Sequence, residues 1–118
     1  YPERRTLPVE RLDLVALGQL TFRPADEARW PALRLAREVM KAGGLSGAVF
    51  NAAKERALDG FIERRIGFQE IAAGVEDVLS RISAKPGHID ADITLDNVLQ
   101  VDHLARVRAD EIISEKRG

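Results

Sequence analysis

Residues 45–68 read LSGAVFNAAKERALDGFIERRIGF, and this segment says more about the architecture than any other part of the chain. Ala and Gly recur in it at helical spacing, which predicts a helix that approaches a neighbouring helix closely. Asn51 is the one amide in the segment, so we expect it to be partly buried and to fix helix packing. Contact of Asn51 with a neighbouring domain is the less favoured alternative. The segment contains no catalytic group in a reactive setting.

Two helices are predicted between residue 31 and this segment's end. Pro31 suits the first turn of the first helix, because proline lacks the N–H that would be unpaired there, and Gly43-Gly44 ends it. Its buried face is expected to consist of Leu33, Ala36, Val39 and Met40. The second helix runs over residues 47–65, with Ser46 as its cap. Its buried face is expected to contain Val49, Ala52, Ala53, Ala57, Phe61 and Ile62.

Two further helices follow. Gly67 is expected to end the second helix in a left-handed conformation and to open the third, with Ile66 packed on Ile71. The residues that the third helix is expected to bury are Ile71, Val75, Val78, Leu79 and Ile82. Lys85-Pro86-Gly87 predicts a turn, and Thr94 is the predicted cap of the last helix. The apolar residues expected on that helix are Leu95, Val98, Leu99, Val101, Leu104, Ala105 and Ile112.

Residues 1–30 show no sustained helical period and predict an extended arm. Leu20 and Phe22 alternate with a polar residue, which indicates a short strand before Arg23-Pro24 interrupts it. A single short strand is not stable alone, so the apolar residues of the arm require a partner from outside this chain. Trp30 precedes a proline, so we expect it to be extended and to fill the base of the helical bundle.

These features predict an all-α protein with two parts. A four-helix-bundle-like C-terminal domain at residues 31–118 follows an extended, partly strand-like arm at residues 1–30. With 118 residues and 45% hydrophobic content, the chain is long enough for one compact domain. It contains no cysteine, which excludes disulfides, zinc sites with thiolate ligands and a cysteine nucleophile.

The charge and the apolar pattern exclude several classes of partner. Lys and Arg number 18 against 19 Asp and Glu, so the net charge of -1 gives no reason to expect nucleic acid or an anionic membrane. The longest apolar runs fall far short of the roughly 20 residues needed to cross a bilayer. No apolar signal-peptide core follows the N-terminal residues. We therefore expect a soluble chain, and the absence of cysteine fits a reducing cytoplasm.

The residues that most resemble a catalytic or metal site lie late in the chain. They are His88, Asp90, Asp92, Asp96 and His103, which include potential metal ligands and acid–base groups. His103 lies about two helical turns beyond Asp96, so these groups meet at one metal only if the preceding loop folds back. The favoured interpretation is a solvated loop with helix-capping carboxylates. A small metal-dependent hydrolase is the weaker alternative.

Phosphate binding is not predicted. The sequence has neither a Gly-x-Gly-x-x-Gly that follows a strand nor a Gly-Lys-Ser/Thr loop. Arg64-Arg65 are adjacent cations, but their place beside Glu63 at a helix end favours compensation of the helix dipole. We therefore predict no catalytic, cofactor-binding or metal-binding residue in this chain.

Several short motifs occur in a fixed order along the chain. They are Tyr1-Pro2, Leu12-Asp13, Leu20-Thr21-Phe22, Pro24-Ala25-Asp26, Trp30-Pro31, Phe50-Asn51-Ala52-Ala53-Lys54-Glu55, Ile66-Gly67-Phe68 and Asp102-His103-Leu104-Ala105-Arg106. Their order and spacing resemble the C-terminal region of the 1-deoxy-D-xylulose 5-phosphate reductoisomerase family, over nearly the whole chain. Lys54 departs from the family pattern, which has Asn there, and we expect the lysine to face solvent.

The resemblance implies a place in a larger enzyme. In that family the enzyme converts 1-deoxy-D-xylulose 5-phosphate to 2-C-methyl-D-erythritol 4-phosphate for non-mevalonate isoprenoid biosynthesis, with NADPH and a divalent metal, Mg or Mn. The family's residues for NADPH, metal and phosphate lie upstream of the matched region, so none is carried over. The chain is thus expected to be a fragment, inactive alone, that packs on the missing NADPH-binding and catalytic domains. The parent enzyme is expected to be a homodimer in a bacterial cytoplasm or a plastid.

The alternative hypothesis is a stand-alone helical protein-interaction module. In that case the exposed arm captures a partner or exchanges between copies of the chain. The residues expected to make this contact are Leu12, Leu14, Val15, Leu17, Leu20 and Phe22.

Overall fold

The computed structural model describes residues 2–116, which contain five helices. These are α1 (Leu14–Leu17), α2 (Pro31–Ala42), α3 (Ser46–Ile62), α4 (Phe68–Ser83) and α5 (Leu95–Glu115). The predicted all-α, four-helix architecture is confirmed by α2 to α5. No strand occurs within residues 2–116, so the strand-like segment predicted at Leu20 to Phe22 is wrong. Tyr1, of the first motif, and residues 117 and 118, at the end of the predicted bundle domain, lie outside the described residues.

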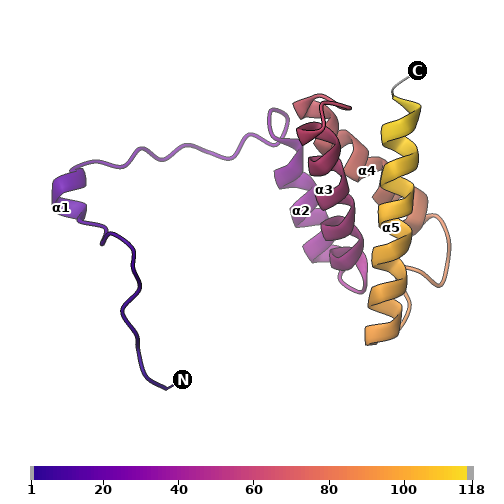
Figure 1. Ribbon diagram of the computed structural model, residues 1–118, viewed down its shortest axis with the longest axis horizontal. Helices are drawn as coiled ribbons and strands as arrows, with labels where there is room; N and C mark the ends of the chain where they lie inside the picture. Colours follow the sequence, from indigo (N-terminus) through magenta and orange to yellow (C-terminus); the bar gives the residue numbers. More distant parts are fainter. Residues whose placement is uncertain (1, 117–118) are drawn as a thin grey trace.

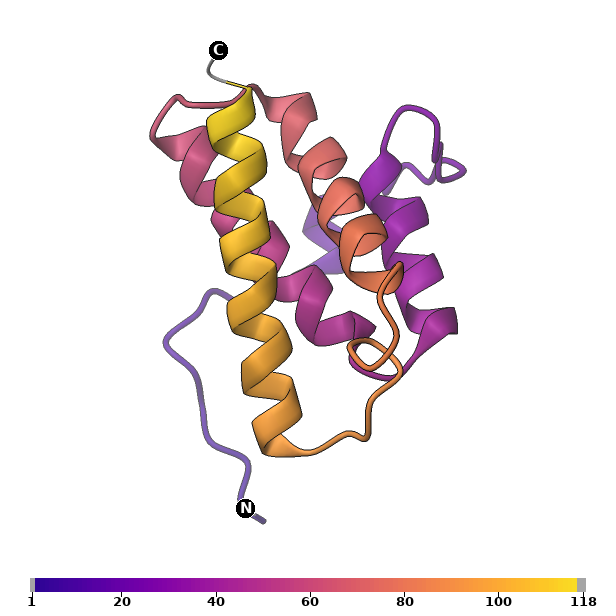
Figure 2. The same ribbon diagram turned by 90° about the vertical axis from the view of Figure 1, so that its right-hand side faces the viewer.

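The four long helices form one bundle around α3. Helix α3 packs against α2, α4 and α5, and α4 also contacts α2 and α5 (Figure 1). Figure 2, turned by 90° from Figure 1, shows the whole length of α5 in front, with α4 next to it and α2 beyond α4. The arm leaves the bundle at the start of α2 and runs away from it, with α1 in its distant part (Figure 1).

Small residues on α3 allow the close approach to α5 that the sequence predicts. Ala52, Ala53 and Ala57 are buried, and a Cβ added at Gly60 would lie 3.0 Å from Cδ1 of Ile113. The other buried apolar residues are Leu35, Leu45, Val49, Ile66, Val75, Val78, Ile82, Val101, Ala105, Ala109, Ile112 and Ile113. Two residues predicted for this core, Phe61 and Ile62, are exposed because α3 reaches its end there.

Helix α2 buries a different face from the predicted one. Leu35 is only 2% exposed, whereas Met40 is 82% exposed and Leu33 is also exposed. Ala36 and Val39, at the border between the two faces, are half-buried. The apolar residues of α2 occur on both sides of this border, so periodicity alone did not identify the face that contacts α3 and α4.

The ends of α3 differ from the prediction in two ways. Ser46 is the first helical residue rather than the cap, and its buried hydroxyl donates to the carbonyl of Val39 at 3.1 Å and to that of Gly43. At the other end the left-handed residue is Arg64, with a φ of 59°, and not Gly67, which is extended. The N–H of Arg65 bonds to the carbonyl of Gly60 at 2.8 Å and that of Arg64 to Phe61 at 2.9 Å, so α3 ends in a Schellman motif.

The last two helices begin and end close to the predicted positions. Gly87 has a φ of 81° in the predicted turn, and Thr94 Oγ1 accepts from the N–H of Asn97 at 3.2 Å as the cap of α5. Leu95 and Leu99, however, are exposed. Leu99 lies between Val98, which packs against the core, and the buried Val101, so it belongs to the outer face of α5. None of the helices among residues 2–116 combines the length and apolar character needed to cross a bilayer.

Candidate functional site

The histidines and aspartates singled out in the sequence do not meet at one point. Asp90 Oδ1 accepts from the N–H of Gly87 at 2.7 Å, and the carbonyl of Asp92 accepts from Asn97 Nδ2 at 2.9 Å. His103 lies exposed on α5. Within the described residues no three His, Cys, Asp or Glu side chains are placed to hold a metal ion. Asp90 therefore stabilises the loop through its carboxylate, as turn residues do, whereas Asp92 contributes only its backbone carbonyl.

Asn51 is exposed, contrary to the prediction that it is partly buried. Its Nδ2 donates to Glu55 at 3.0 Å, and its Oδ1 accepts from the ammonium of Lys54 at 3.1 Å. Lys54, which departs from the family pattern, is exposed, as predicted. All three residues lie on the side of α3 that faces away from the core, so Asn51 orders the helix surface rather than the helix interface.

A cluster of charged side chains joins α3 to α5. Arg106 donates to Glu55 at 2.8 Å and to Asp102 at 2.7 Å. The predicted pair of Asp102 and Arg106 is thus present, but the third member, Glu55, is supplied by another helix and was missed. The hydrogen bond from Arg106, followed by that from Asn51, lowers the pKa of Glu55, and the two carboxylates raise the pKa of Arg106. The cluster brings together the motifs at residues 50–55 and 102–106.

Other ion pairs connect the remaining helices. Arg34 joins α2 to Glu76 of α4 at 2.8 Å, and Arg81 joins α4 to Glu115 of α5 at 3.2 Å. Arg56 bridges α3 to Asp110 of α5. These side chains are partly exposed, so each pair contributes modestly to stability. Their carboxylates and guanidiniums pair with one another across helices, which is a structural arrangement and not an acid–base site.

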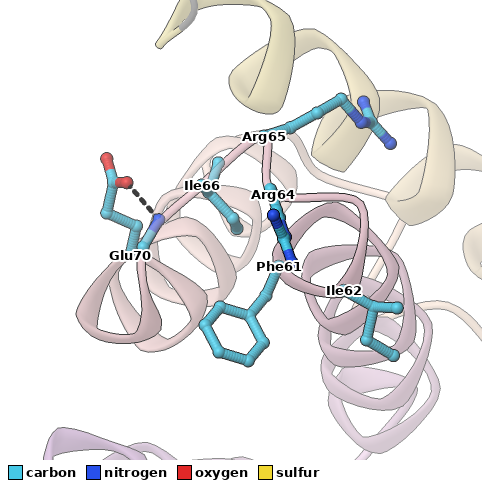
Figure 3. Close-up of a pocket in the computed structure, with 7 residues that line it drawn as sticks. Phe61, Ile62, Arg64, Arg65, Ile66 and Glu70 are labelled. Carbon is cyan, nitrogen blue, oxygen red and sulfur yellow. Dashed lines mark hydrogen bonds between the residues drawn. The ribbon is translucent and has the colours of Figure 1, made fainter.

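The hollow beside Arg64 and Arg65 lies where α3 turns into α4 (Figure 3). It has a volume of about 550 Å³, and Phe61, Ile62 and Ile66 contribute its apolar lining. Arg65 pairs with Glu63 at 2.7 Å. Glu70 accepts from the N–H of Gly67 at 2.6 Å, which, together with the weaker contact from Lys116, lowers the pKa of Glu70. The arrangement caps α4 and accommodates the end of α3. Arg65 is paired with Glu63, so Arg64 and Arg65 do not form a paired cationic site for a ligand.

A second hollow, which we call the aromatic groove, was missed in the sequence. It has a volume of about 560 Å³ and lies where the start of α2 meets α3 and the start of α4. Its aromatic lining is Trp30, Phe50 and Phe68, and its apolar floor includes Leu35, Ile71 and Val75. Trp30 is 47% exposed and Phe68 is 63% exposed. The prediction that Trp30 fills the base of the bundle is therefore wrong. Trp30 forms one wall of an open groove, and the guanidinium of Arg29 lies 5.3 Å from its ring centre.

The arm presents apolar side chains that have no partner within residues 2–116. Their exposure ranges from 47% at Leu17 to 91% at Val15. The full set is Leu7, Val9, Leu12, Leu14, Val15, Leu17, Leu20 and Phe22. Asp13 accepts from the N–H groups of Val15 and Ala16, which begins the single turn of α1, and α1 has no buried residue. Such a series of exposed apolar side chains is typical of a binding surface.

Comparison with known proteins gives one consistent result. The family model of the DXP reductoisomerase C-terminal domain matches residues 1–108. A 1-deoxy-D-xylulose 5-phosphate reductoisomerase of Ruegeria pomeroyi is 66% identical over 118 residues, which are 100% of this chain and 30% of that protein. One of Cereibacter sphaeroides is 57% identical over 114 residues, 97% of this chain and 29% of that protein.

A solved structure is also similar. The reductoisomerase of Zymomonas mobilis, in complex with NADPH, superposes with a TM-score of 0.78 and 38% sequence identity over 96% of this chain. That match covers 29% of the solved chain. The present chain thus spans about 30% of the length of the relatives it matches.

Proposed function

The chain belongs to the 1-deoxy-D-xylulose 5-phosphate reductoisomerase family, and we propose from this membership that it works as the C-terminal domain of such an enzyme. The enzyme would convert 1-deoxy-D-xylulose 5-phosphate to 2-C-methyl-D-erythritol 4-phosphate, and this domain would support the catalytic part without taking part in the chemistry. The observation that carries the proposal is the arm, whose apolar side chains lack a partner among residues 2–116. The remainder of the enzyme supplies that partner.

The proposed role assigns a different function to each of the two parts of the chain. Residues 1–30 act as the linking arm that packs on the catalytic part, and residues 31–118 act as the supporting bundle. The ion pairs between helices keep the bundle rigid, while the arm has an ordered conformation only when its apolar residues are covered. We propose that the complete enzyme is a homodimer and that it works in the bacterial cytoplasm. The bacterial relatives support the second part of this proposal.

The cofactors belong to the other part of the enzyme in this proposal. In the complete enzyme NADPH would supply hydride, and a divalent metal, Mg or Mn, would stabilise charge in the reaction. The residues of this chain fit neither group: the sequence has no Gly-x-Gly-x-x-Gly fingerprint, and residues 2–116 have no cluster of metal ligands. No step of the reaction is therefore assigned to a residue of this chain.

A chimera tests the proposal. The Ruegeria pomeroyi enzyme is prepared with its matching 118 C-terminal residues either deleted or replaced by this chain. Substrate-dependent oxidation of NADPH is then measured for both, and for this chain alone. We expect activity only in the chimera. An active deletion variant, an inactive chimera that is folded, or turnover by the chain alone would each contradict the proposal.

The stand-alone interaction module remains the second candidate, and the same exposed arm favours it. It predicts that the chain alone associates in a concentration-dependent way and that removal of the arm abolishes this association. An inactive but folded chimera together with such association would select this second function.

A further inference from the structure

The aromatic groove is an open apolar surface that the bundle itself does not cover. Phe68, at the start of α4, is 63% exposed, and Trp30, which also lines the groove, is 47% exposed. Aromatic side chains of this kind are enriched at the centres of protein interfaces. The polar groups at the rim are engaged locally, since Glu70 caps α4 and Lys54 bonds to Asn51. The groove therefore offers an apolar centre with a polar rim.

The place where the arm joins the bundle is part of this groove. Residues 28–32, the last of the arm and the first of α2, line one side of it. Any structure that packs on the arm is thereby tethered beside the groove, at a high effective concentration. The arm and the groove can be covered by one body, because they are continuous in the chain.

The part of the enzyme that could cover the arm and the groove is large. The chain matches 30% of the Ruegeria pomeroyi enzyme, and the family model it matches is that of the C-terminal domain. In a complete enzyme of this family the greater part of the polypeptide therefore precedes the arm. Arg29 on the groove rim favours carboxylates or carbonyl oxygens next to the apolar residues of that body.

We infer that the aromatic groove is the surface on which the preceding part of the same polypeptide packs, with apolar side chains between Trp30 and Phe68. This inference rests on the proposed function and adds to it a specific contact outside the arm. It makes Phe68 an interface residue, although Phe68 lies 38 positions along the sequence from Trp30 and belongs to another helix.

Hydroxyl-radical labelling, read residue by residue by mass spectrometry, tests the inference. The chain alone is compared with the chimera that contains the preceding part of the Ruegeria pomeroyi enzyme. Phe68 reports the groove, and Phe22 reports the arm. Met40 and Leu99 are the controls, because both are exposed and lie on α2 and α5 away from the groove lining.

We expect labelling of Phe68 and Phe22 to fall several-fold in the chimera, while labelling of Met40 and Leu99 stays the same. Unchanged labelling of Phe68 with protection of Phe22 in an active chimera would overturn the inference and leave the proposed function intact. Unchanged labelling of both in an inactive chimera would overturn both.

A pair of variants in the chimera checks that the protection comes from packing in the groove. Phe68→Ser removes an aromatic wall and is expected to return the labelling of Trp30 towards that of the chain alone. Leu99→Ser, a change at a similarly exposed residue on α5, is expected to leave Trp30 protected. Protection of Trp30 that survives Phe68→Ser would contradict the inference.

Discussion

Side chains on the surface of the bundle join residues that are distant in the sequence. Arg106 illustrates this, because it is 51 positions from Glu55 and donates to it at 2.8 Å while it also pairs with Asp102. Each contact is partly open to water, so a single bond stabilises the fold only weakly. The stabilisation by the cluster comes from several bonds to one guanidinium. Two of the predictions concern such single side chains.

The first prediction concerns Arg106. Arg106→Met keeps an unbranched apolar stem and removes both ion pairs, so the free energy of unfolding should fall by about 1 kcal/mol. The side chain is 34% exposed, which limits the effect through screening by water. Urea unfolding measures the change, and Arg108→Met is the control, because Arg108 pairs with Glu111 on the same helix. An equal loss in both variants would show that the connection between helices adds nothing.

The second prediction concerns pH. The N–H of Gly67 and then Lys116 lower the pKa of Glu70 below its ordinary value of 4.5. The ionised group is bound more favourably in the folded state, so its contribution to stability is complete above pH 4.5 and is lost as the pH falls through the lowered pKa. Glu70→Gln should therefore lower stability at pH 7 and show a smaller loss than the original chain on acidification.

The control for this prediction is Glu10→Gln, a change on the arm away from the bundle. Urea midpoints of the three proteins are compared at neutral and acidic pH. If Glu70→Gln and the original chain lose stability in parallel on acidification, the cap of α4 does not depend on the charge of Glu70.

The contacts between helices are set by where small residues occur. On α3, a Cβ at Gly60 would lie 3.0 Å from the buried side chain of Ile113, whereas on α4 a Cβ at Gly74 would lie 4.0 Å from Ile112. The two glycines are both buried in helices, but only at the first would a Cβ be in tight contact with its neighbour, which would have to shift. The distance between α3 and α5 therefore depends on Gly60.

The third prediction compares these glycines. Gly60→Val overpacks the contact between α3 and α5 and should lower the free energy of unfolding by about 2 kcal/mol. Gly74→Ala fills free space and improves helix propensity, so it should raise stability by about 0.5–1 kcal/mol. Thermal and urea unfolding measure both. Equal effects of the two changes would mean that Ile113 moves aside without cost.

Helix positions were predictable from sequence where local chemistry defines them. Pro31, the turn at Lys85-Pro86-Gly87 and the cap at Thr94 act through their own backbone bonds, and all three are confirmed. The left-handed residue at the end of α3 was misplaced, because the helix ends earlier than its apolar pattern and a non-glycine residue, Arg64, takes that conformation. Which residue takes the left-handed conformation depends on how the next helix packs.

Burial was harder to predict than helix position. Asn51 is next to Ala52 in the sequence, but one residue turns the chain by about 100° around a helix, which is enough to place Asn51 on the exposed side and Ala52 in the core. Likewise the buried face of α2 is centred on Leu35, and only the positions of α3 and α4 identify it. The aromatic groove is formed by three helices, and no single stretch of sequence indicates it.

The chain is more extended than a compact domain of the same length. Its radius of gyration is 18.2 Å, whereas a compact domain of this length has a value of about 13.5 Å. The difference arises from the arm, which extends away from the bundle with its apolar residues exposed (Figure 1). Exposed apolar residues on this scale are unfavourable in water unless another body covers them.

The fourth prediction tests the claim on which the rest depends, that the remainder of the enzyme buries the arm. The chimera with the Ruegeria pomeroyi enzyme is given the paired changes Leu20→Ser and Phe22→Ser, and its rate of NADPH oxidation is measured. We expect a large loss of activity. Leu99→Ser on the bundle surface of the chimera should leave its activity unchanged. The paired changes in the chain alone should leave the stability of the bundle unchanged. Full activity in the arm variant would contradict the proposed role of the arm.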